Sequence, residues 1–188
     1  MTTAGIIIGI VYCLALTTSV VPWAVGLEPK GESTASRQVL VALVFAATQA
    51  LMAFVGYLLG KMVGYLFGDL LKFVTFGMMI IVATKMVIDS MKVLKGKRLY
   101  SFTSNWGYLL LGILAGMNTL LMSVCTQGYM PFGKGYFLAI AGAALVWAWF
   151  SVRTLYTPKM LRVTSFVEFS GGVFMAVIAI LYLFTDLI

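Results

Sequence analysis

A few polar side chains interrupt the long apolar runs of this sequence, and chemistry could occur at these positions. Gln49 and Asn118 each carry an amide with two N–H donors and a carbonyl acceptor, which a single backbone bond cannot satisfy. Burying such a group in hydrocarbon is costly unless it is paired or faces a cavity. Each amide is therefore a candidate for an interhelical hydrogen bond or for contact with a solute.

Hydroxyl groups extend this polar set. After Asn118, Thr119, Ser123, Thr126 and Gln127 recur at i, i+4, i+7 and i+8, which places them on one helical face. Two threonines lie in the first apolar run, where a hydroxyl commonly bonds back to the carbonyl one turn earlier. The substrate-pocket candidates are Thr17, Thr18, Gln49, Asn118, Thr119, Ser123 and Gln127.

Two opposite charges, Lys85 and Asp89, lie near the end of the third apolar run. They stand four residues apart, on one helical face, and can form an ion pair. Pairing lowers the cost of placing both charges near a membrane. We interpret the pair as structural, and the alternative is a gate or a proton relay.

The composition excludes most enzyme classes. The 188 residues are 62% hydrophobic and 10% charged, and the mean hydropathy is +1.03. A soluble domain is nearer half apolar and a quarter charged. With no His, six Asp and Glu, and two Cys, the chain lacks the ligands for a His or Cys metal cage and cannot form a His-based triad. We therefore predict that the protein is not an enzyme, that it holds no cofactor, and that no cage of His or Cys ligands binds a metal.

The apolar runs have the length of membrane helices. A transmembrane helix needs about 20 mostly apolar residues, so this chain holds roughly six. We predict an all-α, polytopic membrane protein that forms a single domain over residues 1–188, with the lipid bilayer as its surroundings. The expected spans are about 5–27, 38–60, 69–93, 106–128, 135–156 and 163–188.

The basic residues indicate topology rather than nucleic-acid binding, although the net charge is +7. Nine Lys and Arg lie in the first, third and fifth connections, and three lie on the opposite side. Cytoplasmic connections keep the excess of positive residues. The prediction is a multi-pass protein of the inner, cytoplasmic membrane with both termini extracytoplasmic and no nucleic-acid partner.

Three expected spans lie on each side of the basic connection at residues 92–98. An odd number of spans per repeat inverts the second half relative to the first. We therefore expect two inverted repeats, about residues 1–93 and 106–188. Glycines four apart, as at Gly5 and Gly9 and again at Gly112 and Gly116, match between the halves. Close helix packing is the favoured interpretation of these glycines.

Short motifs along the whole chain resemble the MntP-type manganese exporters, within the lysine-exporter superfamily of six-helix transporters. Gln49, seven places before Gly56, stands where the family's second helix has an acidic residue. The segment from Lys85 through Met86 to Asp89 is similar to the family's basic, Met, aliphatic, aliphatic, acidic ending. Asn118, between Gly116 and Ser123, stands where the family carries an Asp thought to bind manganese. The resemblance implies a transporter fold.

The acidic positions of the family are neutral here. If Ser19 is used as the anchor, the family's remaining Asp falls near Leu14, so the three positions hold Leu14, Gln49 and Asn118. Hard divalent cations prefer carboxylates, which repay the cost of dehydration. We therefore expect a transporter-like protein whose substrate is a neutral polar solute or at most a monovalent cation. The alternative is a non-transporting membrane subunit or scaffold of a larger complex with other membrane subunits.

Overall fold

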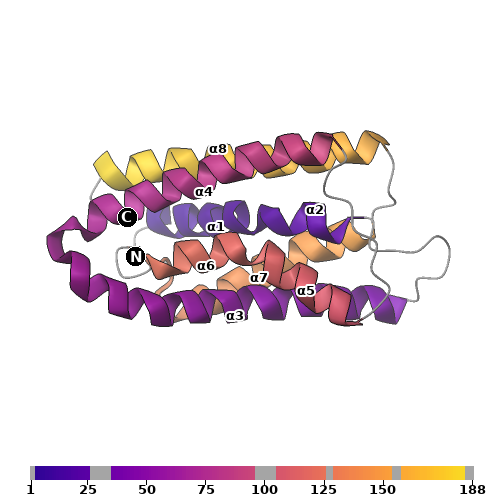
Figure 1. Cartoon of the computed structure of the whole chain (residues 1–188), viewed down its shortest axis with the longest axis horizontal. Coiled ribbons are helices and arrows are strands. Elements are labelled where there is room, and N and C mark those ends of the chain that lie inside the picture. Colours follow the sequence, from indigo (N-terminus) through magenta and orange to yellow (C-terminus); the bar gives the residue numbers. More distant parts are fainter. Residues whose placement is uncertain (1–2, 26–34, 96–104, 126–128, 154–157, 185–188) are drawn as a thin grey trace.

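The computed structural model of the protein describes residues 3–25, 35–95, 105–125, 129–153 and 158–184. In these ranges all regular structure is helical, with no strand. The helices run side by side along the long axis of the molecule (Figure 1). The elements are α1 (Thr3–Thr17), η1 (Thr18–Val20), α2 (Val21–Ala24), α3 (Ala35–Phe67), η2 (Gly68–Leu70), α4 (Leu71–Leu94), α5 (Asn105–Ala115), α6 (Met117–Val124), η3 (Gly133–Gly135), α7 (Tyr136–Val152) and α8 (Pro158–Phe184).

The lengths and apolar surfaces of these helices are those of membrane spans. Four segments in the described ranges are long and apolar enough to cross a bilayer: Gly5–Ala24, Ala35–Phe67, Leu71–Leu94 and Lys159–Phe184. Trp106–Ala115 and Met117–Val124 make a fifth if their 43° bend lies within one span. Large apolar side chains such as Leu43, Leu138 and Phe166 face outward, as helices require in lipid. The chain is therefore a multi-pass membrane protein.

Two helices differ in length from the expected spans. α3 has 33 residues, and its rise of about 50 Å exceeds the roughly 30 Å hydrocarbon core. The apolar run continues past Lys61, so this one charge does not end the helix, and the turn comes at Gly68, whose φ is +44°. α7 has 17 residues and covers about 26 Å, slightly less than the hydrocarbon core.

The first and fourth apolar runs are both interrupted in the middle. In the first run, Pro22 has no N–H to donate to the carbonyl of Thr18, and that carbonyl instead accepts from the N–H of Val21. The helix therefore tightens to the 3₁₀ segment η1 before α2. In the fourth run, α5 ends at Ala115 and α6 begins at Met117, with Gly116 between them.

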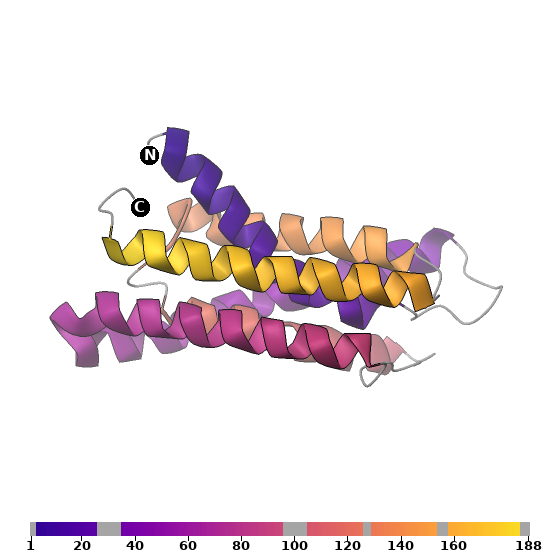
Figure 2. The same ribbon diagram turned by 90° about the horizontal axis from the view of Figure 1, so that it is seen from above.

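The packing of the helices separates two groups. α4 lies along α8, while α3 packs against α5, α6 and α7. α1 contacts both α7 and α8, and so it links the two groups (Figures 1 and 2). The N-terminal end of α1 diverges from the other helices, as Figure 2 shows. This arrangement brings the two interrupted runs together in the interior.

Candidate functional site

The two helix interruptions meet at a serine. The hydroxyl of Ser19, in η1, donates to the carbonyl oxygen of Ala115 over 3.2 Å, and its own-helix partner is the carbonyl of Leu16, also at 3.2 Å. Ser19 is 2% exposed. A bend in a helix can leave carbonyls without their usual N–H donor, and because Ala115 is buried in this conformation, a hydroxyl from another helix bonds its carbonyl. Ser19 therefore joins the end of α5 to the break in the first span.

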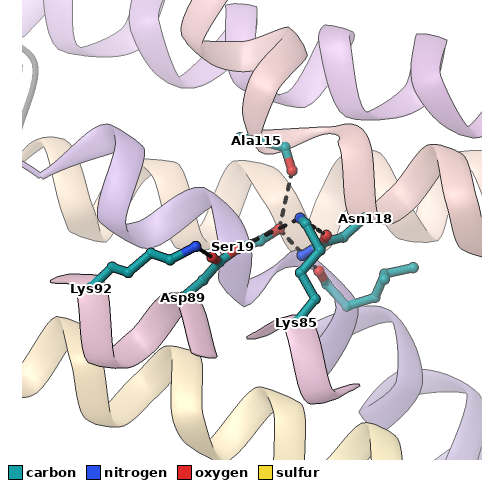
Figure 3. A network of polar contacts seen from close by, with 7 residues as sticks. Ser19, Lys85, Asp89, Lys92, Ala115 and Asn118 are labelled. Atoms are coloured by element: carbon teal, nitrogen blue, oxygen red, sulfur yellow. Dashed lines mark hydrogen bonds and ion pairs between the residues drawn. The ribbon is translucent and has the colours of Figure 1, made fainter. Parts of the chain in front are cut away.

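A lysine from α4 reaches the same place. The ammonium of Lys85 donates to Oδ1 of Asn118, the second residue of α6. Its nitrogen also lies 3.6 Å from Oδ2 of Asp89, and Lys92 lies 3.1 Å from Oδ1 of that carboxylate. Figure 3 shows Ser19, Lys85 and Asn118 pointing toward one another. Asn118 and Asp89 are buried, whereas the Lys85 side chain is 40% exposed.

Gln49 and the hydroxyls of α6 form a second polar group. Thr119 donates to Oε1 of Gln49 on α3, and both side chains are fully buried. Ser123 lies 3.1 Å from the hydroxyl of Tyr136 on α7. Within the described ranges, Nε2 of Gln49 is buried without a hydrogen-bond acceptor. Since Asn118 and Thr119 are consecutive, their side chains leave α6 in different directions, one toward α4 and one toward α3.

The remaining pocket candidates divide as follows. Thr17 donates back to the carbonyl of Cys13 and Thr18 to that of Ala15, each over 2.7 Å. Both threonines are buried, and these local bonds satisfy their hydroxyl hydrogens. Gln127 and its neighbour Thr126 lie outside the described residues. The described part of the predicted stripe is therefore Thr119 and Ser123.

Leu14 is directed away from Asn118. Its carbonyl accepts a hydrogen bond from the indole of Trp147 over 3.0 Å. Its side chain lines an apolar groove of about 290 Å³ with Cys13 and residues of α7 such as Ala139 and Ala143. A carboxylate at position 14 would enter this groove, so Leu14, Gln49 and Asn118 do not form one cluster.

An open groove runs along α4 beside Lys85. It has a volume of about 500 Å³, and its polar lining comes from Thr84, Lys85, Asp89 and Lys92. Two ammonium groups and one carboxylate give this lining a formal charge of +1. The groove follows α4 toward the end of the helix where Lys95 comes next. The groove is connected to Asn118 through the ammonium of Lys85, which lines the groove and donates to the Asn118 amide oxygen.

Buried tyrosines lie beside the polar group formed by Gln49, Thr119 and Ser123. Tyr12, Tyr129 and Tyr182 belong to one core cluster with Tyr136, and the rings of Tyr12 and Tyr129 meet edge to face with centroids 5.2 Å apart. Tyr129 lies in the connection between α6 and η3, where burial raises the pKa of its hydroxyl well above the ordinary range. The tyrosines therefore pack together in the core next to Ser123, which contacts the hydroxyl of Tyr136.

The described residues hold no group of three or more His, Cys, Asp or Glu side chains that could bind a metal. Asp89 is the carboxylate at the site, and lysines contact it on both sides. Sequence reasoning found Lys85 through its spacing from Asp89, but it missed two contacts. Neither the bond from Lys85 to Asn118 nor that from Ser19 to Ala115 leaves a signal in the sequence, because each joins helices far apart in the chain.

Comparison with known proteins gives one assignment. No curated protein and no solved structure matches the chain. A family model described as "Putative manganese efflux pump" matches residues 32–183. The match begins after the first apolar run, so Leu14 and Ser19 lie outside it. Because the matched range covers most of the 188 residues, the chain belongs to the Mntp family of manganese efflux pumps.

Proposed function

We propose that this protein is a small secondary transporter with six spans in two inverted repeats, and that it moves a solute other than a tightly bound divalent cation. The spans form a single transmembrane unit. The observation that carries the proposal is the meeting of two interrupted spans at Ser19 and Ala115, beside the polar side chain of Asn118. Transporters commonly build their sites from discontinuous helices near the middle of the bilayer.

The helix pairing supports the repeat. If α1 with α2 is the first span and α5 with α6 the fourth, then both first members of the repeats are interrupted. The second members, α3 and α7, pack against each other, and so do the third members, α4 and α8. α3 packs against the interrupted fourth span, and α7 packs against the interrupted first span. A twofold relation between halves requires this exchange of partners.

The charges at the site support the choice of solute. Gln49 and Asn118 are neutral, and the buried carboxylate of Asp89 already contacts Lys85 and Lys92. A divalent cation would have to lose its water while Lys85 and Lys92 compete for the Asp89 carboxylate. Amide and hydroxyl groups suit a neutral polar solute, or at most a monovalent cation.

Cysteine accessibility tests whether Asn118 faces an aqueous path. In a chain with Cys13→Ala and Cys125→Ala, we expect Asn118→Cys to react with a charged, membrane-impermeant thiol reagent added to the cytoplasmic side. The matched control is Phe174→Cys, an exposed apolar position in the middle of α8 that faces lipid, and it should not react.

The same experiment addresses the alternative function. Absence of labelling at Asn118→Cys from both sides, in a protein that remains folded, would contradict a transport path. It would favour the non-transporting membrane subunit, and purification with stable partner proteins would then identify the complex.

Manganese transport can be tested in cells that lack their own manganese exporter. We expect expression of this chain to leave cellular manganese unchanged relative to an empty vector, because Gln49 and Asn118 are neutral and lysines contact the Asp89 carboxylate. A fall in cellular manganese that disappears with Asn118→Ala would contradict the proposed solute class. The measurement is total manganese by elemental analysis after growth in manganese-rich medium.

A further inference from the structure

The first helix, α1, is in close contact with the α7 region at two places, and a groove lies between them. At one place, a Cβ atom on Gly9 would lie 2.8 Å from Cζ of Phe132, so the α1 backbone is packed against that ring. At the other, the indole of Trp147 donates to the carbonyl of Leu14 over 3.0 Å. The apolar groove of about 290 Å³ separates these two contacts.

Small residues form the α7 side of this groove. Ala139, Gly142 and Ala143 line it, and a Cβ atom on Gly142 would meet none of the described residues within 4 Å. Small residues usually allow membrane helices to approach each other closely. Here they line a hollow, so contact with another described helix does not account for them.

The groove lies at the depth of the hydrocarbon core. The α1 span begins at Gly5, and the groove residues Ile10 and Leu14 lie about 8 to 14 Å inside this end. Ile10 is 48% exposed and Val146 is 44% exposed, so the groove opens onto the surface that faces lipid. The surroundings at this depth are acyl chains and not water.

The size of the groove favours an acyl chain over a neighbouring helix. The seven-residue step from Ala139 to Val146 covers about 10 Å along α7. A helix of that length, about 10 Å across, fills about 800 Å³, which is more than the groove holds. An apolar cavity of about 150 Å³ already binds benzene, so this groove has room for a longer apolar chain. If it stayed empty, its lining would lose dispersion contacts.

We propose that an acyl chain of a bilayer phospholipid occupies the groove between α1 and α7 and completes the packing of these two helices. The lining is apolar, and the thiol of Cys13 behaves as a small apolar group, so the groove recognises the hydrocarbon chain. The proposal goes beyond transport and does not depend on it, because Leu14 faces the groove and is directed away from Asn118.

Photo-crosslinking of the full-length protein in vesicles tests this occupant. The vesicles contain phosphatidylethanolamine and phosphatidylglycerol, and a small share of the lipid carries a diazirine in one acyl chain. Illumination releases nitrogen and leaves a carbene that inserts into nearby C–H bonds, and mass spectrometry of peptide fragments locates the adducts.

Ile180 on α8 is the matched reference for Ile10. It is 50% exposed against 48% for Ile10, and it lies four residues before the end of its span at Phe184, as Ile10 lies five residues after Gly5. These two ends of α8 and α1 lie at the same end of the bundle (Figure 1). Bulk lipid would label both isoleucines alike. We expect Ile10 to be labelled at least about fivefold more often than Ile180.

Filling the groove should remove this preference. In Gly142→Leu the new side chain enters the groove, because the Cβ has open space, and labelling of Ile10 should fall to the level of Ile180. Gly77→Leu on α4 is the control, since its Cβ also has open space but it does not line the groove. There the preference for Ile10 should remain at least about fivefold. Cooperative thermal unfolding shows that each variant is folded.

Equal labelling of Ile10 and Ile180 in the unchanged protein would overturn the proposal, and this comparison needs no variant to fold. A preference that persists in folded Gly142→Leu would also overturn it. So would a second copy of the chain in the groove, shown by disulfide-linked dimers of Ile10→Cys in a chain with Cys13→Ala and Cys125→Ala. These outcomes are independent of the thiol labelling at Asn118→Cys, so a failure here leaves the proposed transport path as it stands.

Discussion

At the scale of single residues, the hydroxyl groups of the described helices differ in whether they bond only to their own helix or also reach a neighbouring one. Thr17 and Thr18 use the local option, and Thr48 does the same, 2.9 Å from the carbonyls of Val44 and Phe45. Thr119 and Ser19 instead reach other helices. The two kinds of contact predict different effects on stability.

The hydrogen bond between Thr119 and Gln49 should couple the contributions of the two side chains to the free energy of unfolding. We expect Thr119→Val to lower the free energy of unfolding by about 1–2 kcal/mol, because it leaves the fully buried amide of Gln49 without this donor. In the double variant with Gln49→Leu, the loss should be smaller than the sum of the single losses, by about 1 kcal/mol. Reversible unfolding in mixed detergent micelles measures these values. Additive losses would show that the two side chains are not coupled.

Ser19 and Ser170 form a matched pair of serines. Each hydroxyl donates to the carbonyl three residues earlier, but Ser19 also reaches the carbonyl of Ala115. We expect Ser19→Ala to destabilise the protein by about 1 kcal/mol, because a buried carbonyl at the bend loses its donor. Ser170→Ala should change stability by less than about 0.5 kcal/mol. Equal effects in thermal unfolding would argue against a bridge between the two broken spans.

At the scale of the helices, glycines determine how closely α3 approaches the interrupted fourth span. A Cβ atom on Gly56 would collide with the carbonyl oxygen of Leu120 and lie 2.6 Å from Cβ of Ser123. A Cβ on Gly116 would lie 2.7 Å from Cγ of Met52. Small residues allow such close contact between membrane helices. This approach is what brings Gln49 within reach of Thr119.

Replacing these glycines should separate the helices. We expect Gly56→Ala to cost about 1–3 kcal/mol, because the obstructing atom is backbone and cannot rotate away. Gly77→Ala in α4 is the control, since a Cβ there meets nothing within 4 Å, and alanine should be neutral or favoured by up to about 1 kcal/mol. Thermal unfolding of both variants in detergent provides the comparison. Similar melting temperatures for the two would mean that α3 is not held at close range.

At the scale of the whole molecule, basic residues gather near one end of the helix bundle. The start of α3, the ends of α4 and α7 and the start of α8 lie at one end of the bundle (Figure 1), and the basic residues at these helix ends are Arg37, Lys95, Arg153 and Lys159. The first described residue of α1, the last of α8 and the turn η2 all lie at the other end (Figure 1). This arrangement is the one that the positive-inside rule needs for the proposed topology.

The orientation can be tested with two reporters fused after Ile188. With both termini extracytoplasmic, alkaline phosphatase should be active there, and green fluorescent protein should not fluoresce. The expectation follows from the excess of Lys and Arg in the odd-numbered connections. Bright fluorescence with inactive phosphatase would reverse the proposed orientation.

The sequence by itself determined the class of this protein. The 62% hydrophobic composition and the long uncharged runs are properties of local chain segments, and a bilayer selects helices from such segments before any tertiary contact forms. The helical fold and the family follow from these runs and from short motifs such as the one that ends at Asp89. The pairing of Lys85 with Asp89 could also be predicted from the sequence, because residues four apart are separated by about one helical turn.

The tertiary structure alone decided which polar groups meet. Spacing along α6 could not show that Asn118 turns to Lys85 while its neighbour turns to Gln49, because that depends on where α3 and α4 lie. Nor could it show that Leu14 faces α7, since α1 makes contacts on more than one side. Hydrogen bonds between segments distant in sequence depend on how the helices cross. Those crossings are set by close contacts such as that of Gly56 with α6, which only the folded chain contains.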